Sequence, residues 1–129
     1  MTALAKEAIL RFEKLGVWKR ACRLSSDIYK QTKLVRDFGF RDQITRSALS
    51  VASNIAEGEE RNSLKENIRF LYCAKGSLAE LLTQIYIGMD VGYIHKESGR
   101  EAIVESKQIA AMLSRLIQVK QEQLRRTER

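Results

Sequence analysis

Four basic side chains near the start of the chain are spaced to bind phosphate groups. They are Lys19, Arg23, Lys30 and Lys33. On a helix the four share about 80° of arc, which lets one face contact successive phosphates. The sequence has no RNA-recognition motif and no DNA-reading helix-turn-helix, so we expect backbone-directed, salt-dependent binding. The alternative is a solvated face of an amphipathic helix. The predicted nucleic-acid-binding residues are Lys19, Arg20, Arg23, Lys30, Lys33, Arg36, Arg125 and Arg126.

Short polar side chains form a second candidate site between Asp42 and Gly58. They lie opposite an apolar arc, where a solvent-facing helix normally carries Lys and Glu. Partly buried polar groups need hydrogen-bond partners, so we interpret the row as a subunit contact that fixes the register between protomers. The alternative is a solvated face that is poor in long charged side chains. The predicted interface residues are Asp42, Gln43, Arg46, Ser50, Asn54, Glu57, Phe70, Cys73, Ser77 and Gln84.

Residues suited to catalysis or metal binding are sparse. The single histidine, His95, is expected in a turn between helices, where it would be solvated or would cap a helix. Glu57, Glu59 and Glu60 have no His or Asp partner at metal-binding spacing. No glycine-rich loop could cradle a phosphate. We therefore predict a protein that is not an enzyme, with no cofactor and no metal site.

The composition predicts a single all-α domain over residues 1–129. The chain has no proline and seven glycines, and good helix formers dominate. Cys22 and Cys73 lack CxxC spacing, and we expect free, mostly buried thiols. The sequence shows no signal peptide and no apolar run of about 18 residues that could span a membrane. We therefore expect a soluble, cytoplasmic protein.

Positive charge is concentrated towards the two ends of the chain. The net charge is +7, and residues 1–36 carry nine Lys or Arg against three acidic residues. Residues 95–129 carry eight against five. This asymmetry suggests an anionic partner, and nucleic acid fits better than a membrane, because no amphipathic segment combines a basic face with free Trp and Phe. A basic surface without a specific partner is the alternative.

Apolar periodicity and turn signals predict where the helices lie. We expect four, at about residues 15–33, 40–60, 64–89 and 97–124. Ser63 and Glu66 have the spacing of a capping box at the start of the third helix. Residues 1–11 are expected to form a flexible or partly helical arm, and residues 125–129 a frayed basic tail.

The third predicted helix has apolar residues on two sides. The broad arc expected to face the core contains Leu64, Ile68, Leu71, Tyr72, Leu78, Ala79, Leu82, Ile85, Tyr86 and Met89. On the other side, Phe70, Ile87 and several small residues interrupt the polar ones. One four-helix monomer offers a single core, so the surplus apolar surface favours self-association. Burial of this side by loops or by the N-terminal segment is the alternative.

Four segments occur in an order that is specific for one family. They are residues 12–18 (FEKLGVW), 42–58, 69–84 and 91–94 (VGYI). Together they closely resemble the bacterial four-helix bundle family known as 23S rRNA intervening sequence proteins. The resemblance covers roughly residues 12–118. The family usually has a proline at the position of Ala52, where proline would bend the helix, so we expect a straighter second helix here.

The resemblance implies an antiparallel up-down-up-down bundle that assembles into a homopentamer. It also implies similarity to the accessory variability determinant of diversity-generating retroelements, a basic pentameric bundle that works with a reverse transcriptase and nucleic acid. Two functions follow as expectations. The first is a non-enzymatic homo-oligomer that binds nucleic acid or a ribonucleoprotein through its basic surfaces. The alternative is a protein-interaction adaptor, for example an accessory subunit of a reverse transcriptase, with no direct nucleic-acid role.

Overall fold

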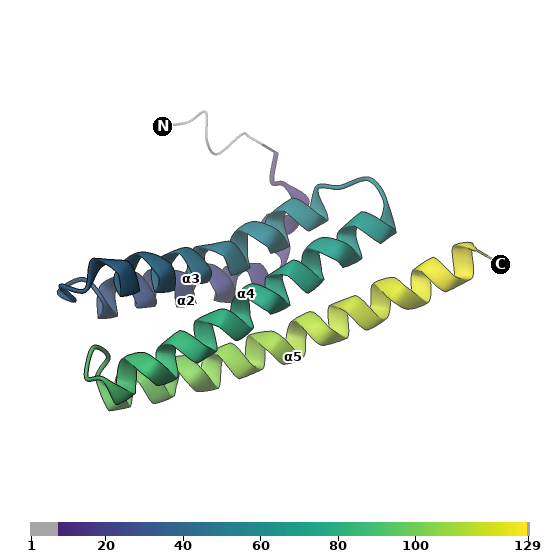
Figure 1. Ribbon diagram of the computed structural model, residues 1–129. Coiled ribbons are helices and arrows are strands. Elements are labelled where there is room, and N and C mark those ends of the chain that lie inside the picture. The colour runs from purple at the N-terminus through teal and green to yellow at the C-terminus, as the bar shows by residue number, and fades with distance from the viewer. Residues whose placement is uncertain (1–7, 129) are drawn as a thin grey trace.

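The computed structural model describes residues 8–128, and these residues form a helical bundle (Figure 1). The elements are, in chain order, a short 3-10 helix η1 (Arg11–Lys14) and four α-helices, α2 (Gly16–Gln31), α3 (Phe38–Glu59), α4 (Leu64–Asp90) and α5 (Lys96–Thr127). Residues 1–7 and Arg129 lie outside the described part of the chain. The predicted all-α, four-helix fold is confirmed. Each predicted helix end lies within three residues of the observed one.

Successive helices run in opposite directions, so the bundle goes up, down, up and down (Figure 1). The connections are short, at residues 32–37, 60–63 and 91–95, as expected for antiparallel neighbours. Each helix contacts two others: α3 packs between α2 and α4, and α5 packs between α4 and α2. The four helices therefore enclose one core.

Side-chain caps fix where α3 and α4 begin. Asp37 accepts a hydrogen bond from the Phe40 amide (3.1 Å) at the start of α3. At α4, the Ser63 hydroxyl accepts from the Glu66 amide (3.1 Å), which is half of the expected capping box. The Glu66 carboxylate accepts from Arg69 instead. These caps satisfy backbone N–H groups that would otherwise lack partners in the first turns.

The two chain ends differ from the expected arm and tail. Residues 1–7 of the predicted arm lie outside the described residues, and the chain then enters η1 at Arg11. At the other end α5 continues to Thr127, so residues 125–127 are helical rather than frayed. Arg125 and Arg126 both pair with Glu122, at 2.7 and 3.3 Å. Basic side chains in a last turn also oppose the negative end of the helix dipole.

The core follows the predicted apolar stripe closely in α3 and less closely in α4. The apolar arc of α3 that lies opposite the polar row is buried, and it consists of Ile44, Ala48, Val51, Ala52 and Ile55. In α4 the prediction that Tyr72, Ala79 and Tyr86 face the core is wrong, because the two tyrosines are 49% and 51% exposed and Ala79 is exposed. Ala74 and Leu81 are buried instead. A tyrosine at the edge of the apolar arc keeps its hydroxyl accessible to polar partners, and Gln121 of α5 donates to Tyr72 (3.3 Å).

Helix length increases along the chain, from 16 residues in α2 to 32 in α5. At a rise of 1.5 Å per residue, α2 is about 24 Å long and α5 about 48 Å. Gly16, the first residue of α2, lies level with Met112 of α5. The last fifteen residues of α5 therefore extend past the start of α2, and no other α-helix of residues 8–128 occupies the position that a longer α2 would have.

Candidate interaction surfaces

The solvent face of α2 carries the predicted basic stripe. Lys19, Arg23 and Lys30 are exposed on α2, whereas Lys33 and Arg36 are exposed in the connection to α3, because α2 ends at Gln31. Within residues 8–128 none of these five side chains forms an ion pair. The stripe is therefore accessible to an anionic partner.

Three other predicted phosphate-binding residues already have carboxylate partners. Arg20 donates to both oxygens of Glu105 on α5, at 2.8 and 2.6 Å, and it also bonds Gln108. The guanidinium of Arg20 holds the pKa of Glu105 below its usual value, and the carboxylate raises the pKa of Arg20. Arg125 and Arg126 are paired with Glu122. These three arginines connect or stabilise helices in this structure.

Carboxylates border the basic stripe on its α5 side. Arg20, Arg23 and Asp27 of α2 line a cleft together with Glu101 and Glu105 of α5. Their opposite charges offset one another at this edge of the helix. The positive potential of α2 is therefore directed outwards, away from α5.

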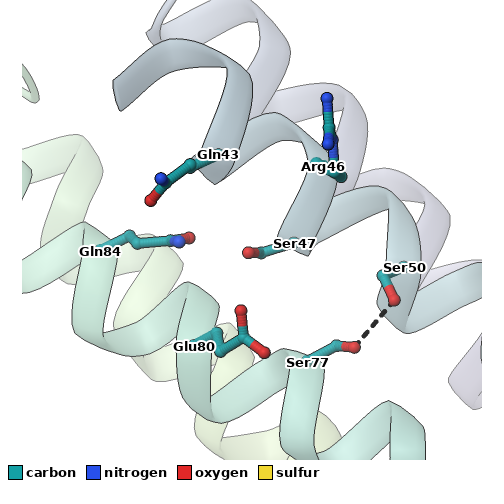
Figure 2. A pocket seen from close by; sticks show the side chains of 7 residues that line it. All are labelled: Gln43, Arg46, Ser47, Ser50, Ser77, Glu80 and Gln84. Atoms are coloured by element: carbon teal, nitrogen blue, oxygen red, sulfur yellow. Dashed lines mark hydrogen bonds between the residues drawn. The ribbon is translucent and has the colours of Figure 1, made fainter. Parts of the chain in front are cut away.

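The polar row of α3 lies along a groove that α3 forms with α4 (Figure 2). The groove is lined by Gln43, Arg46, Ser47, Ser50, Ser77, Glu80 and Gln84. Ser50 and Ser77 share a hydrogen bond of 2.8 Å across it, and Asn54 donates to the Ser50 carbonyl and hydroxyl at 2.9 and 3.0 Å. Part of the row thus finds its partners inside one chain.

The sequence-based set omitted two groove residues, Ser47 and Glu80. Each lies three residues from a predicted one, Ser47 before Ser50 and Glu80 after Ser77. Residues three apart are neighbours on a helix surface. The i,i+3 spacing was therefore the signal that could have found them.

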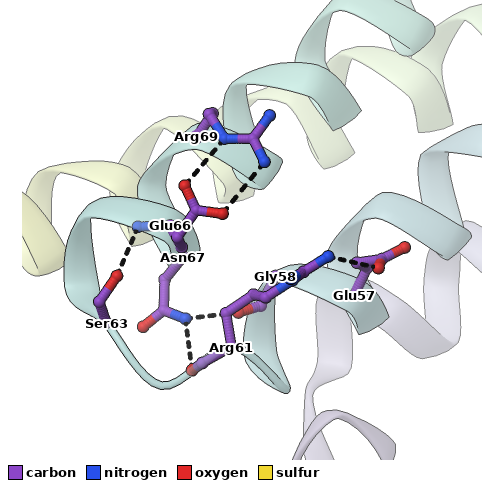
Figure 3. Close-up of polar contacts among 7 residues, drawn as sticks. All are labelled: Glu57, Gly58, Arg61, Ser63, Glu66, Asn67 and Arg69. Atoms are coloured by element: carbon purple, nitrogen blue, oxygen red, sulfur yellow. Dashed lines mark hydrogen bonds and ion pairs between the residues drawn. The ribbon is translucent and has the colours of Figure 1, made fainter.

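The turn between α3 and α4 uses one further predicted interface residue, Glu57 (Figure 3). Glu57 pairs with Arg61 at 2.8 Å. Asn67 donates to the carbonyls of Gly58 and Arg61, the latter at 3.1 Å. These bonds close the turn and hold the first turn of α4 against the last turn of α3.

Phe70, also predicted at the interface, contacts residues of its own chain. It is half-buried against Gly58, with the guanidinium groups of Arg61 and Arg69 at 4.8 and 4.5 Å from its ring centre. Stacking of this kind is favourable for arginine. Asp42 and Arg46 are both exposed and form no ion pair with each other, although their i,i+4 spacing permits one.

Comparison with known proteins identifies the family. The family model described as 23S rRNA-intervening sequence protein matches residues 13–115. The chain belongs to this family. A crystal structure from Bacteroides thetaiotaomicron, described as a protein with unknown function from the S23 ribosomal protein family, is similar, with 25% sequence identity and a TM-score of 0.73. The match covers 78% of this chain and 97% of that one. None of the curated proteins matches.

In this 23S rRNA-intervening sequence protein, α3 runs without a break through Ala52, which is buried. Both thiols are free, as expected. Burial raises the pKa of Cys22. Cys73 is exposed rather than buried, because it lies on the outer side of α4. The Cys22 thiol therefore lacks the lowered pKa of a reactive cysteine.

Other candidate chemistry of this family member has structural explanations. His95 is the N-cap of α5, where its Nδ1 accepts from the Glu97 amide (3.3 Å). Glu59 is buried in an ion pair with Lys120 (2.9 Å). Within residues 8–128 no group of three His, Cys, Asp or Glu side chains could hold a metal ion. None of the helices in the described range is both long and apolar enough to cross a membrane.

Proposed function

We propose that the protein is a non-enzymatic homo-oligomer that binds the phosphate backbone of nucleic acid, or of a ribonucleoprotein, through the exposed basic face of α2. One observation carries the proposal. Lys19, Arg23 and Lys30 follow one exposed face, and none of them has an ion-pair partner among residues 8–128. From Lys19 to Lys30 the face is about 16 Å long. Such a face attracts phosphates without reading base sequence.

The binding test compares two triple variants that lose the same charge. Lys19→Gln, Arg23→Gln and Lys30→Gln remove three positive charges from α2. The control removes three from the outer face of α5, with Lys96→Gln, Arg100→Gln and Lys107→Gln, all exposed residues. Fluorescence anisotropy across a salt series should show weaker binding of labelled RNA and DNA only for the α2 variant, with a salt slope lower by about 2.7 on duplex DNA and by about 2.1 on single strands. Equal binding by the two variants would contradict the proposal.

Self-association is proposed through the α3–α4 groove. Arg46 and Glu80 are exposed on opposite walls and form no ion pair within the described part of the chain. A second copy offers each of them the opposite charge, and several copies of the α2 face would strengthen the positive field. We propose a pentamer by analogy with the family described above. Light scattering after size exclusion tests this, with Arg46→Glu expected to lower the mass and Arg100→Glu expected to leave it unchanged. A monomeric wild type would contradict it.

A protein-interaction adaptor, for example an accessory subunit of a reverse transcriptase, is the second candidate. It is supported by the pairing of Arg20, Arg125 and Arg126 with carboxylates, which reduces the basic surface available to phosphates. In this case the remaining charge would aid docking and solubility. An unchanged affinity for nucleic acid in the α2 triple variant, together with loss of a protein partner, would favour the adaptor.

A further inference from the structure

An apolar groove flanks α5 at the point where α2 begins. It is lined by Leu15, Gly16, Val17, Met112, Arg115, Leu116 and Val119. Most of these side chains are apolar, and Val119 is 50% exposed. Met112, Leu116 and Val119 are spaced i, i+4 and i+7, which is the spacing of a helix seam that receives another helix. Since α2 starts here, its own apolar face cannot cover the seam beyond Met112.

The described N-terminal segment does not fill this groove. Before α2 the chain turns towards α3, and η1 contacts only α2 and α3. Phe12 packs edge-to-face on Trp18, with ring centres 5.1 Å apart, and lines a different groove beside Ser53 and Ala56 of α3. Residues 8–128 thus leave the α5 seam uncovered on the side where a longer α2 would lie.

The buried Glu59–Lys120 ion pair closes the core beneath the seam. It joins α3 to α5 across the diagonal of the bundle, at 2.9 Å, with exposed side-chain fractions of only 5% and 11%. The pair lies in the part of the bundle beyond the start of α2, because Lys120 follows Met112 by eight residues on α5. The groove is therefore a surface channel above a closed core, and an occupant would lie on it without opening the bundle.

The rim of the groove is positively charged. Arg115 is exposed in the lining and forms no ion pair within residues 8–128. Arg126 lies on the same side of α5, eleven residues further along and 70% exposed in its side chain. Carboxylates on an occupant would be attracted chiefly to Arg115, because Glu122 already offsets the charge of Arg126.

We infer that the groove is a docking site for an acidic amphipathic helix of a partner protein, which would lie beyond the N-terminal end of α2 and pack its apolar face on Met112, Leu116 and Val119. The site is separate from the proposed phosphate-binding face of α2 and from the α3–α4 groove. It gives the bundle a protein-recognition surface of its own. The partner helix would lie beside the C-terminal half of α5, in the position that a longer α2 would occupy.

Two synthetic helical peptides test the inference on the full chain. Both carry leucines at i, i+4, i+7 and i+11; one has glutamates on its flanks and the other has lysines. Fluorescence anisotropy should show binding of the glutamate peptide only. Val119→Glu should weaken it about tenfold, from lost apolar burial and added repulsion. The matched control is Val104→Glu, because Val104 is equally exposed on α5, at 56%, but lies outside the groove. Arg115→Glu should shift the preference towards the lysine peptide.

Four outcomes would overturn the inference. They are no binding of the glutamate peptide, equal weakening by Val119→Glu and Val104→Glu, tighter binding after deletion of residues 1–7, and a lower oligomer mass for Val119→Glu in light scattering. The third would assign the groove to the chain's own N-terminus, and the fourth to a second copy. None of these measurements depends on nucleic-acid binding, so their failure would not contradict the proposed phosphate-binding function of α2.

Discussion

The seam between α3 and α4 and the seam between α2 and α5 are built from different side chains. Across the first, hydroxyls and a glycine lie between the helices, as in the Ser50–Ser77 hydrogen bond and the contact of Gly58 with Phe70. Across the second, the long pair Arg20–Glu105 spans the gap. Short side chains let two helix backbones approach, and long charged ones hold them apart.

This difference determines which polar residues remain available to partners. In the α3–α4 seam, close approach allows polar groups of the two helices to satisfy one another. In the α2–α5 seam, the bridging side chains leave a cleft, and the short α2 leaves the end of α5 uncovered. A polar row on a helix can therefore reflect close packing within a chain as well as contact between chains.

The largest change in the free energy of unfolding is expected at the buried Glu59–Lys120 ion pair, which joins α3 to α5 beyond the start of α2. Lys120→Met removes the partner of buried Glu59 while keeping the volume. The free energy of unfolding should fall by about 3–5 kcal/mol, because a buried carboxylate is left unpaired. Urea unfolding measures it. The double variant Glu59→Leu with Lys120→Met removes both charges and should recover most of the loss. A single variant within about 1 kcal/mol of wild type would contradict this.

Two glycine substitutions test how closely α3 and α4 approach. A Cβ at Gly58 would lie 2.9 Å from the Cβ of Phe70 and 3.3 Å from the Asn67 carbonyl. Gly58→Ala should therefore lower the free energy of unfolding by about 1–2 kcal/mol, because overpacking outweighs the gain in helix propensity. A Cβ at Gly76 of α4 would meet no neighbouring atom within 4 Å. Gly76→Ala should therefore raise the free energy of unfolding by about 1 kcal/mol, because alanine has the higher helix propensity. Shifts of the same sign in thermal and urea unfolding would contradict the close approach.

A smaller effect is expected for the hydroxyl pair of the α3–α4 seam. Ser50→Ala and Ser77→Ala should each lower the free energy of unfolding by about 1 kcal/mol, because each leaves a part-buried partner with one hydrogen bond fewer. A double-mutant cycle by urea unfolding should then give a coupling of about 0.5 kcal/mol or more. Ser53→Ala, at an exposed α3 position, is the control and should change stability little. Additive single effects would show that the pair does not couple.

Much of the fold could be predicted because it depends on local patterns. Four apolar stripes, the Ser63 cap and the absence of proline predicted the ends of all four α-helices to within three residues, but not the 3-10 helix η1. The exposure of Tyr72 and Tyr86 could not be predicted in this way. Both fall on a broad apolar arc, and only the positions of α3 and α5 determine which part of that arc is covered.

The candidate sites depend on pairing between helices, which a single helix pattern does not contain. The exposed positions of Lys19 and Lys30 followed from their own helix. The partner of Arg20, Glu105, is 85 residues away on α5, so the pattern of α2 alone could not predict that Arg20 is ion-paired. The polar row of α3 was identified as needing hydrogen-bond partners, but periodicity cannot say whether these belong to the same chain.

The smallest effect is expected at the Arg20–Glu105 pair of the α2–α5 seam, which is partly exposed to water and screened by it. Arg20 lowers the pKa of Glu105 in the folded state, chiefly through their hydrogen bonds. A carboxyl group whose folded pKa is depressed contributes stability above its unfolded pKa of about 4.3, and this contribution is lost as pH falls through the folded pKa.

Arg20→Gln should therefore reduce stability slightly at pH 7 and flatten its decline in acid, because Glu105 then titrates closer to its unfolded value. Urea unfolding at a series of pH values between neutral and about 3 measures both changes. Arg23→Gln is the matched control, because Arg23 acts on the pKa of Glu105 only as the smallest contribution. The uncharged Ser50–Ser77 pair has no titrating group, so Ser77→Ala should keep the acid profile of wild type. The same dependence of unfolding free energy on pH for Arg20→Gln and Ser77→Ala would contradict this expectation. The two seams would then differ in side-chain length but not in the contribution of charge to their stability.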